Sequence, residues 1–323
     1  MRGIVAAPLR IAIVTPAGRG SRAGNRVTAL RWAGLLRQLG HRPRLYTAWQ
    51  QHPCDLLVTV HAVKSAPVVL AARRERPDLP IVTLLSGTDI YPWIDLDAQT
   101  DAALHAADAL LCLQPRALEA LPEALRARAH ALLQSATALP APRDESFSMC
   151  MLSHLRPVKG ALEAIRAVAA LPAATQATLT IAGEELDERY SAQVHAAIEA
   201  TPRVAWAGAL SRRASKLLLA RSAVCLVPSL AEGGPNVISE ALAAGTPVLC
   251  SDAPGNLGVL GDDWPGTFAV ADVEAMAAAI QAAATDTEFL DGLRAATAAL
   301  QPMVAPARER EGWRQLLERL RAR

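Results

Sequence analysis

Two carboxylates separated by a glycine-rich turn mark the stretch of this chain best suited to chemistry. The segment Glu232-Gly-Gly-Pro-Asn-Val-Ile-Ser-Glu240 puts seven residues between its two glutamates, and a helix is predicted over residues 236–244. A helix N-terminus binds phosphate through its unpaired N–H groups and the positive end of its dipole. The two glycines let the backbone approach a ligand closely, and each glutamate can bind a diol. The segment therefore suits a diphosphate between two polyols, as in a nucleotide sugar. An ordinary strand–turn–helix connection is the alternative.

A basic turn earlier in the same half of the chain supplies cations for such a ligand. The turn His154-Leu-Arg-Pro-Val-Lys-Gly160 joins a predicted strand to a predicted helix. A departing nucleoside diphosphate gains negative charge in the transition state, so fixed cations lower the barrier without a metal. We expect Arg156 and Lys159 to hold the diphosphate, although a solvated basic turn would have the same sequence.

The first predicted strand ends in a loop rich in glycine and arginine, which leads into a helix near residue 25. Its glycines lack the G-x-G-x-x-G spacing, and no acidic residue ends the second strand, which disfavours a dehydrogenase. We expect Gly24, Asn25 and Arg26 to bind a phosphate at the helix start. Arg19 or Arg22 could close over that phosphate, or the loop could simply be solvated.

Two further loops follow buried strands and would lie at the same edge of the sheet. His61 could hydrogen-bond a sugar hydroxyl, and Lys64, with Ser65 beside it, could neutralise a phosphate. Thr88 and Asp89 would lie at the rim of the same site. The alternative for His61 is a hydrogen-bonded histidine at the edge of the sheet. The alternative for Thr88 and Asp89 is a plain turn, since glycine and aspartate are common turn formers.

Strand-like runs alternate with helical patterns along the whole chain, which predicts an α/β protein built on parallel sheets. In the first half, strands are expected at 10–16, 44–48, 55–62, 80–86, 109–113 and 129–133, and helices at 25–39, 65–76, 98–107 and 115–121. In the second half, strands are expected at 147–153, 177–182, 204–207, 223–228 and 247–251, and helices at 160–171, 190–200, 212–220, 236–244 and 273–284. A helical tail from residue 288 onward is expected to break near Pro302 and Pro306.

The segment 138–146 is rich in proline and polar residues and is predicted to link two doubly wound halves. We place one Rossmann-like domain at residues 1–143, a second at 144–300, and a final helix at 301–323. Ligands of doubly wound sheets bind beyond the carboxyl ends of the strands, so both domains could face one cleft.

Composition and charge restrict the classes of function. The chain has 323 residues and a net charge of +2, which gives no case for nucleic acid. Residues 1–146 hold 17 basic and 12 acidic side chains, whereas the remainder holds 16 basic and 19 acidic ones. The first half is therefore modestly positive, which fits a small anionic ligand. The five cysteines lack metal-site spacing, which favours free thiols in a cytoplasmic protein. No stretch approaches a membrane span, and no metal, cofactor or membrane partner is expected.

Together these motifs resemble the GT-B glycosyltransferases, and within them family 4. Arg156-Pro-Val-Lys159-Gly160 is similar to that family's Arg-x-x-Lys-Gly turn for the donor diphosphate, and Glu232 and Glu240 are similar to its paired glutamates. The resemblance implies an N-terminal acceptor domain, a C-terminal donor domain and a final helix that crosses back. It implies that Glu240 binds the ribose hydroxyls and that Glu232 contacts the donor sugar. The donor-binding set it implies is Arg156, Lys159, Glu232, Gly233, Gly234, Pro235, Asn236 and Glu240.

A narrower resemblance lies in the first half, which departs from the commoner family 4 pattern. Three stretches look like the selenosugar synthases of selenoneine biosynthesis: Thr15-Pro-Ala with Gly24-Asn-Arg-Val-Thr-Ala-Leu-Arg-Trp32, His61-Ala-Val-Lys-Ser65, and Ser86-Gly-Thr-Asp-Ile-Tyr91. This resemblance implies a selenophosphate acceptor and a UDP-sugar donor, UDP-N-acetylglucosamine. The products would be a 1-seleno-sugar, UDP and phosphate.

A selenophosphate anion is already a strong nucleophile at neutral pH, so it needs no general base to remove a proton. Under this hypothesis Arg156 and Lys159 stabilise departing UDP, while His61, Thr88 and Asp89 orient the sugar and the acceptor. The acceptor phosphate is assigned to Gly24, Asn25, Arg26, Lys64 and Ser65.

Three other functions fit the same motifs. A family 4 enzyme with a hydroxyl acceptor would need base assistance, and a UDP-sugar 2-epimerase would consume donor without an acceptor. A nucleotide-sugar sensor would bind UDP and turn nothing over, although four separate candidate ligand loops argue against pure sensing. The sequence leaves oligomeric state and anomeric outcome open.

Overall fold

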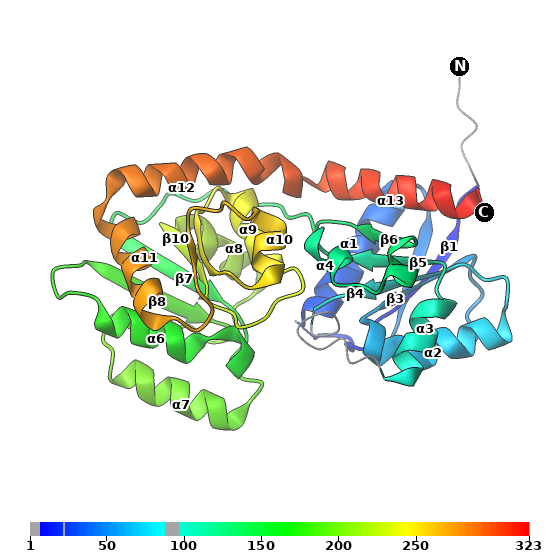
Figure 1. Ribbon diagram of the computed structural model, residues 1–323, viewed down its shortest axis with the longest axis horizontal. Helices are drawn as coiled ribbons and strands as arrows, with labels where there is room; N and C mark the ends of the chain where they lie inside the picture. The colour runs from blue at the N-terminus through cyan, green and yellow to red at the C-terminus, as the bar shows by residue number, and fades with distance from the viewer. Residues whose placement is uncertain (1–6, 22, 88–96, 323) are drawn as a thin grey trace, which may run out of the picture. The chain divides into compact units, whose positions relative to one another are not determined.

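The computed structural model describes residues 7–21, 23–87 and 97–322. The chain forms two compact units, one made of Met1–Gln134 with Pro306–Arg323 and the other of Ser135–Ala305 (Figure 1). In the described residues each unit holds a parallel six-stranded sheet with helices on it, which confirms the predicted pair of doubly wound α/β domains. The proline-rich segment 138–146 lies inside the second unit.

The sheet of the first unit has the strand order β2-β1-β3-β4-β5-β6. Its strands are β1 (Arg10–Val14), β2 (Arg42–Tyr46), β3 (Leu56–Val60), β4 (Ile81–Leu85), β5 (Ala109–Cys112) and β6 (Ala129–Ala131). Its helices are α1 (Gly24–Gln38), α2 (Ala62–Glu75), α3 (Ala98–Ala106), α4 (Arg116–Glu119), α5 (Glu123–Arg126) and α13 (Pro306–Arg321). Because β2 and β3 lie on opposite sides of β1, the strand order reverses between β1 and β3.

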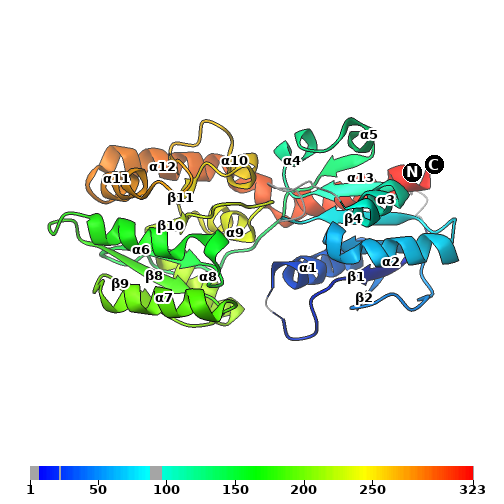
Figure 2. The same ribbon diagram turned by 60° about the horizontal axis from the view of Figure 1, so that its bottom comes forward.

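Both faces of this sheet are covered, so its strands are apolar on both sides rather than alternating. Ile11 and Ile13 of β1 belong to a core shared with α1 and α13. Ala12 and Val14, which point the other way, belong to a core shared with α2 and α3. Helices α2 and α3 lie side by side (Figure 2).

Helix α13 completes the first unit beside α1 (Figure 1). The buried rings of Trp32 and Trp313 meet edge to face with their centroids 4.9 Å apart. The fully buried Glu309 carboxylate accepts a hydrogen bond from Trp32 Nε1 at 2.7 Å and pairs with Arg31 Nε at 3.0 Å. Gly312 allows close approach, because a Cβ there would lie 2.4 Å from Leu132 Cδ1. The last helix is therefore part of the core of the first unit.

The sheet of the second unit has the strand order β12-β11-β10-β7-β8-β9. Its strands are β7 (Phe147–Leu152), β8 (Ala177–Ala182), β9 (Val204–Trp206), β10 (Val224–Val227), β11 (Val248–Ser251) and β12 (Thr267–Phe268). Its helices are α6 (Ala161–Ala170), α7 (Glu188–Glu199), α8 (Arg212–Arg221), α9 (Asn236–Ala244), α10 (Pro254–Leu260), α11 (Val273–Thr285) and α12 (Thr287–Leu300), with short 3-10 turns η1 (Pro157–Lys159) and η2 (Gln301–Val304).

Most predicted elements are present with their ends shifted by one or two residues, but a few predictions were wrong. The elements that were missed are η1, α5, α10 and β12, which are too short to show a periodicity. The strand predicted at 55–62 ends at Val60, because His61 has a φ of 77° and is the N-cap of the next helix. That helix, α2, starts three residues before its predicted start and contains Pro67.

The five cysteines are free, as predicted, and all five are buried. Burial raises the pKa of the Cys250 thiol to about 12, so this thiol is inert at neutral pH. Among the described residues, no helix is both long and apolar enough to cross a membrane.

An ion pair at the start of the first sheet makes a pH-dependent contribution to stability. Asp55 accepts hydrogen bonds from the backbone and guanidinium of Arg10, and these lower its pKa from 3.8 to about 2. A depressed carboxyl pKa stabilises the fold above the unfolded value and loses that contribution as pH falls through the folded value. We therefore expect Asp55→Asn to lower the urea midpoint at pH 7 by a small amount, since the pair is half exposed.

The difference in urea midpoint between wild type and Asp55→Asn should shrink as the pH falls from about 4 to about 2. Urea titrations at pH 7, 4 and 3 measure it. A difference that stays constant over this range would contradict the assignment.

Candidate functional site

The order of the second sheet reverses between β7 and β10, with β8 and β9 on one side and β11 and β12 on the other. Ligands of doubly wound sheets bind at such a reversal, beyond the carboxyl ends of the strands. The loop after β7 carries Arg156 and Lys159, and the loop after β10 carries Glu232. The topology thus brings together two motifs that are 73 residues apart in the sequence.

Lys159 and Glu232 contact each other directly. Lys159 Nζ lies 2.5 Å from Glu232 Oε1, and Ser229 Oγ donates to the same oxygen at 2.7 Å. The Glu232 side chain is 10% exposed and that of Lys159 24% exposed. Both residues were predicted to contact the donor, and they are neighbours in the structure.

The two loops also meet through their backbones. The N–H of Leu230 donates to the carbonyl of Val158 at 2.9 Å. Gly160 has a φ of 72°, and a Cβ there would lie 2.3 Å from the carbonyl oxygen of Pro228. Only glycine fits this position, so the Lys-Gly pair of the motif is required by backbone contact as well as by charge.

Arg156 precedes the 3-10 turn η1 in extended conformation. Its side chain is exposed, and within the part of the chain that is described its guanidinium makes no ion pair. A guanidinium in this state can bind a phosphate without first releasing a carboxylate.

Helix α9 presents its N-terminus at this point of the sheet. Pro235 occupies its N-cap position without a side-chain cap, and its first turn, which begins at Asn236, carries no acidic residue. Glu240 lies four residues after Asn236, on the same face of the helix. Burial and Arg212 lower the pKa of Lys216 on α8, and the negative charge of Glu240 opposes this shift. Gly233 and Gly234 connect Glu232 to this helix start.

A buried polar network, which sequence reasoning missed, holds the Glu232 loop. Ser251 Oγ donates to the Ser229 carbonyl at 2.5 Å, and Asn256 Nδ2 donates to Ser251 Oγ at 3.0 Å. A Cβ on Gly255 would lie 1.9 Å from the Glu232 carbonyl oxygen. Only the pairing of β10 with β11 brings these residues together, so no local sequence signal marks them.

In the first unit, the loops after β1 and β3 flank the point where the strand order reverses. Gly24, Asn25 and Arg26 form the first turn of α1, where they were expected to bind phosphate. Ala23 at the N-cap provides no side-chain cap, and the first turn contains no acidic residue. An uncapped helix start with a cation beside it is suited to a phosphate. Arg19 is exposed in the preceding loop.

His61 lies between β3 and α2 in a conformation that non-glycine residues rarely adopt, with a φ of 77°. Its Nδ1 accepts a long hydrogen bond of 3.5 Å from the Lys64 N–H, and the residue is 8% exposed. Backbone strain of this kind is concentrated at functional sites. Lys64 is exposed, whereas the buried Ser65 hydroxyl donates to the Val60 carbonyl at 2.9 Å. Its proton is therefore not available to a phosphate.

Three predicted site residues, Thr88, Asp89 and Arg22, lie outside the described residues. No group of three or more histidine, cysteine, aspartate or glutamate side chains in the described ranges could hold a metal ion.

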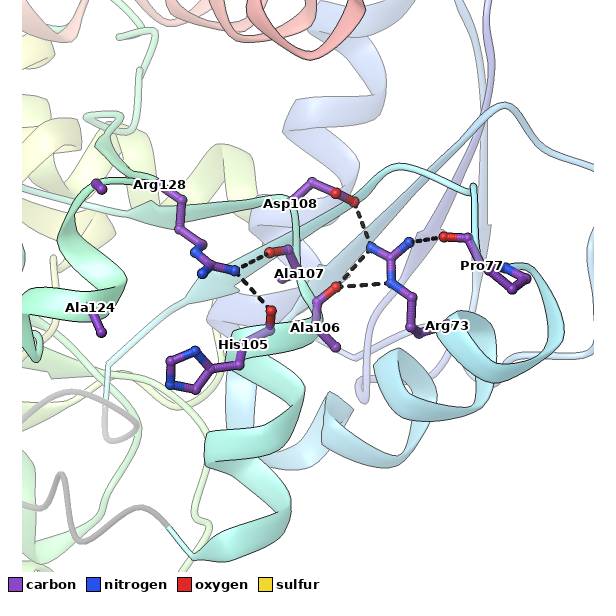
Figure 3. Close-up of a pocket in the computed structure, with 9 residues that line it drawn as sticks. Arg73, Pro77, His105, Ala106, Ala107, Asp108, Ala124 and Arg128 are labelled. Atoms are coloured by element: carbon purple, nitrogen blue, oxygen red, sulfur yellow. Dashed lines mark hydrogen bonds and ion pairs between the residues drawn. The ribbon is translucent and has the colours of Figure 1, made fainter. Parts of the chain in front are cut away.

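A cavity of about 650 Å³ lies in the first unit beside the amino ends of β4, β5 and β6, whereas the candidate loops of this unit follow the carboxyl ends of β1 and β3. Arg73 donates to the carbonyls of Pro77 and Ala106 and pairs with Asp108 at 2.7 Å (Figure 3). Arg128 donates to the carbonyls of His105 and Ala107. These guanidinium groups satisfy the backbone at the end of α3, so we assign the cavity a structural role.

Comparison with known proteins finds one matching family model and many solved structures of similar fold. The family model described as glycosyl transferases group 1 matches residues 139–298. Comparison with curated protein sequences finds no match.

Solved structures with the same fold are numerous. Anabaena HepE in complex with UDP-glucose shares 18% identity over 98% of this chain and 100% of its own, with a TM-score of 0.80. Sucrose-phosphate synthase from Thermosynechococcus elongatus shares 16% identity over 97% and 99% of the two chains, also with a TM-score of 0.80. The pneumococcal O-GlcNAc transferase GtfA, in complex with UDP and GlcNAc, shares 18% identity over 82% of this chain and 56% of its own, with a TM-score of 0.66.

These neighbours show the GT-B fold over nearly the whole chain. The family match includes every residue of the predicted donor set, from Arg156 to Glu240. Residues 139–298 match the model of the group 1 glycosyl transferases, and the chain as a whole has the GT-B fold.

Proposed function

We propose that the protein transfers the sugar of UDP-N-acetylglucosamine to selenophosphate. Selenium attacks the anomeric carbon, the bond from that carbon to the diphosphate oxygen breaks, and UDP leaves with the electron pair. Water then takes the phosphoryl group from selenium, which yields a 1-seleno-sugar and phosphate.

The donor half of the proposal rests on the arrangement at the β7–β10 reversal. Arg156 and Lys159 supply positive charge, and α9 presents an uncapped N-terminus beside Glu232. The combination fits a diphosphate, and Glu232 and Glu240 can accept hydrogen bonds from the hydroxyls on its two sides. UDP and UDP-glucose, bound by the structural neighbour HepE, have this chemistry.

The acceptor half rests on the first unit. Arg26 and Lys64 are located in the first turns of two helices, and neither of these turns contains an acidic residue. Such a surface suits a small anion, and selenophosphate is a small anion that needs no base to become nucleophilic. A hydroxyl acceptor would call for a carboxylate near the attacking oxygen.

The first experiment is incubation of purified protein with UDP-N-acetylglucosamine, with and without fresh selenophosphate, read by mass spectrometry. We expect UDP and a selenium-bearing sugar only when both substrates are present. Donor consumed without selenophosphate would indicate hydrolysis, and an unchanged mass would be examined by NMR for epimerisation. Intact donor in both tubes would contradict this donor–acceptor pair and lead to hydroxyl acceptors.

A further inference from the structure

We infer that Glu232 is a built-in counter-ion for Lys159, which the donor diphosphate must displace before Glu232 can bind the donor sugar. The inference deepens the proposed function and rests on it. It assigns an order of events to one site, in which diphosphate binding precedes sugar recognition.

The ion pair is held in place, unlike a fluctuating surface pair. Lys159 Nζ and Ser229 Oγ both contact Oε1 of Glu232, at 2.5 Å and 2.7 Å, and the carboxylate side chain is nine-tenths buried. The loop behind it is fixed by Ser251 and by close packing against Gly255. Exposed ion pairs contribute little to stability, because holding their two side chains together costs conformational entropy. Here the fold already holds the Glu232 side chain in place.

One ammonium group cannot fully neutralise both a carboxylate and a diphosphate. A diphosphate that arrives while Glu232 keeps Lys159 would lie beside an uncompensated negative charge. Transfer of Lys159 from Glu232 to the diphosphate removes this repulsion. It also frees Oε1 of Glu232 to accept a hydrogen bond from a sugar hydroxyl. Arg156, whose exposed guanidinium makes no ion pair within the described ranges, can engage the diphosphate first.

The test is calorimetric titration of UDP and of UDP-N-acetylglucosamine into wild type and Glu232→Gln. The substitution keeps the shape of the side chain and removes its charge. We expect UDP to bind about tenfold more tightly to Glu232→Gln, a change of ~1.4 kcal/mol. UDP-N-acetylglucosamine should gain less, because its sugar loses a charged acceptor.

Two controls make the result specific. Asp291→Asn removes one negative charge from an exposed pair with Arg294 on α12, and it should leave both affinities unchanged. In a Lys159→Gln background the gain from Glu232→Gln should become smaller, since there is then no ion pair to displace and only the direct repulsion between carboxylate and diphosphate is relieved.

Equal or weaker UDP binding by Glu232→Gln would overturn the inference, and so would a gain that is undiminished without Lys159. If wild type binds both ligands, either of these results leaves the proposed donor intact. If wild type binds neither ligand, the proposed function itself is wrong.

Discussion

Alanine at both Arg156 and Lys159 is expected to lower kcat for sugar transfer about 10³-fold. Removal of a single preorganised donor to a developing anion costs about 10²–10³ in rate, and both cations here face the same leaving group. The donor KM should rise as well, because the ground-state diphosphate also loses its partners. Steady-state assays of UDP release with both substrates measure the two effects.

A matched double variant separates this effect from general loss of positive charge. Arg166→Ala with Arg189→Ala removes two exposed cations from α6 and α7 and should leave turnover near the wild-type value. Unchanged turnover in the Arg156 and Lys159 variant would show that these residues do not stabilise the leaving group.

Glu309→Ala is expected to destabilise the first unit by about 3–5 kcal/mol, the range observed when one partner of a buried ion pair is removed. The change leaves the Arg31 guanidinium, whose side chain is 11% exposed, without its carboxylate. It also removes the acceptor of the buried Trp32 indole N–H. Urea unfolding followed by tryptophan fluorescence measures the loss, because Trp32 and Trp313 lie at this contact.

Glu311→Ala on the same helix is the control. Glu311 pairs with Arg314 at the surface, where ion pairs contribute little. We expect its unfolding midpoint to stay near that of wild type. Equal losses of unfolding free energy in Glu309→Ala and Glu311→Ala would mean that the buried Glu309 contact contributes no more to stability than an exposed ion pair.

The fold could be predicted from the sequence because the strands are short apolar runs and the helices have clear boundaries. The run Ala177–Ala182 was predicted to its exact ends, and so was the helix Asn236–Ala244. Errors occurred where tertiary contacts override local pattern. The helix predicted to start at Ser65 begins at Ala62, because His61 adopts a positive φ and caps it.

The candidate site was predictable only as far as its charged residues. Arg156, Lys159 and Glu232 are recognisable because charge and glycine follow strands in the sequence. The contact between Lys159 and Glu232 was not predictable, because it depends on β7 and β10 being adjacent. Ser251 and Asn256 act on Ser229 through strand pairing, so their local sequence carries no sign of that role.

The place of α13 in the first unit has a consequence for synthesis of the chain. Ribosomes make proteins from the N-terminus, and domains commonly fold as they emerge. The first unit needs Trp313, Leu316 and Leu317 to cover the face of its sheet next to α1. The residues of the second unit, Ser135–Ala305, are all translated before this helix. The second unit can therefore fold during translation, while the first unit remains incomplete, with an apolar face open to chaperones, until α13 has been made.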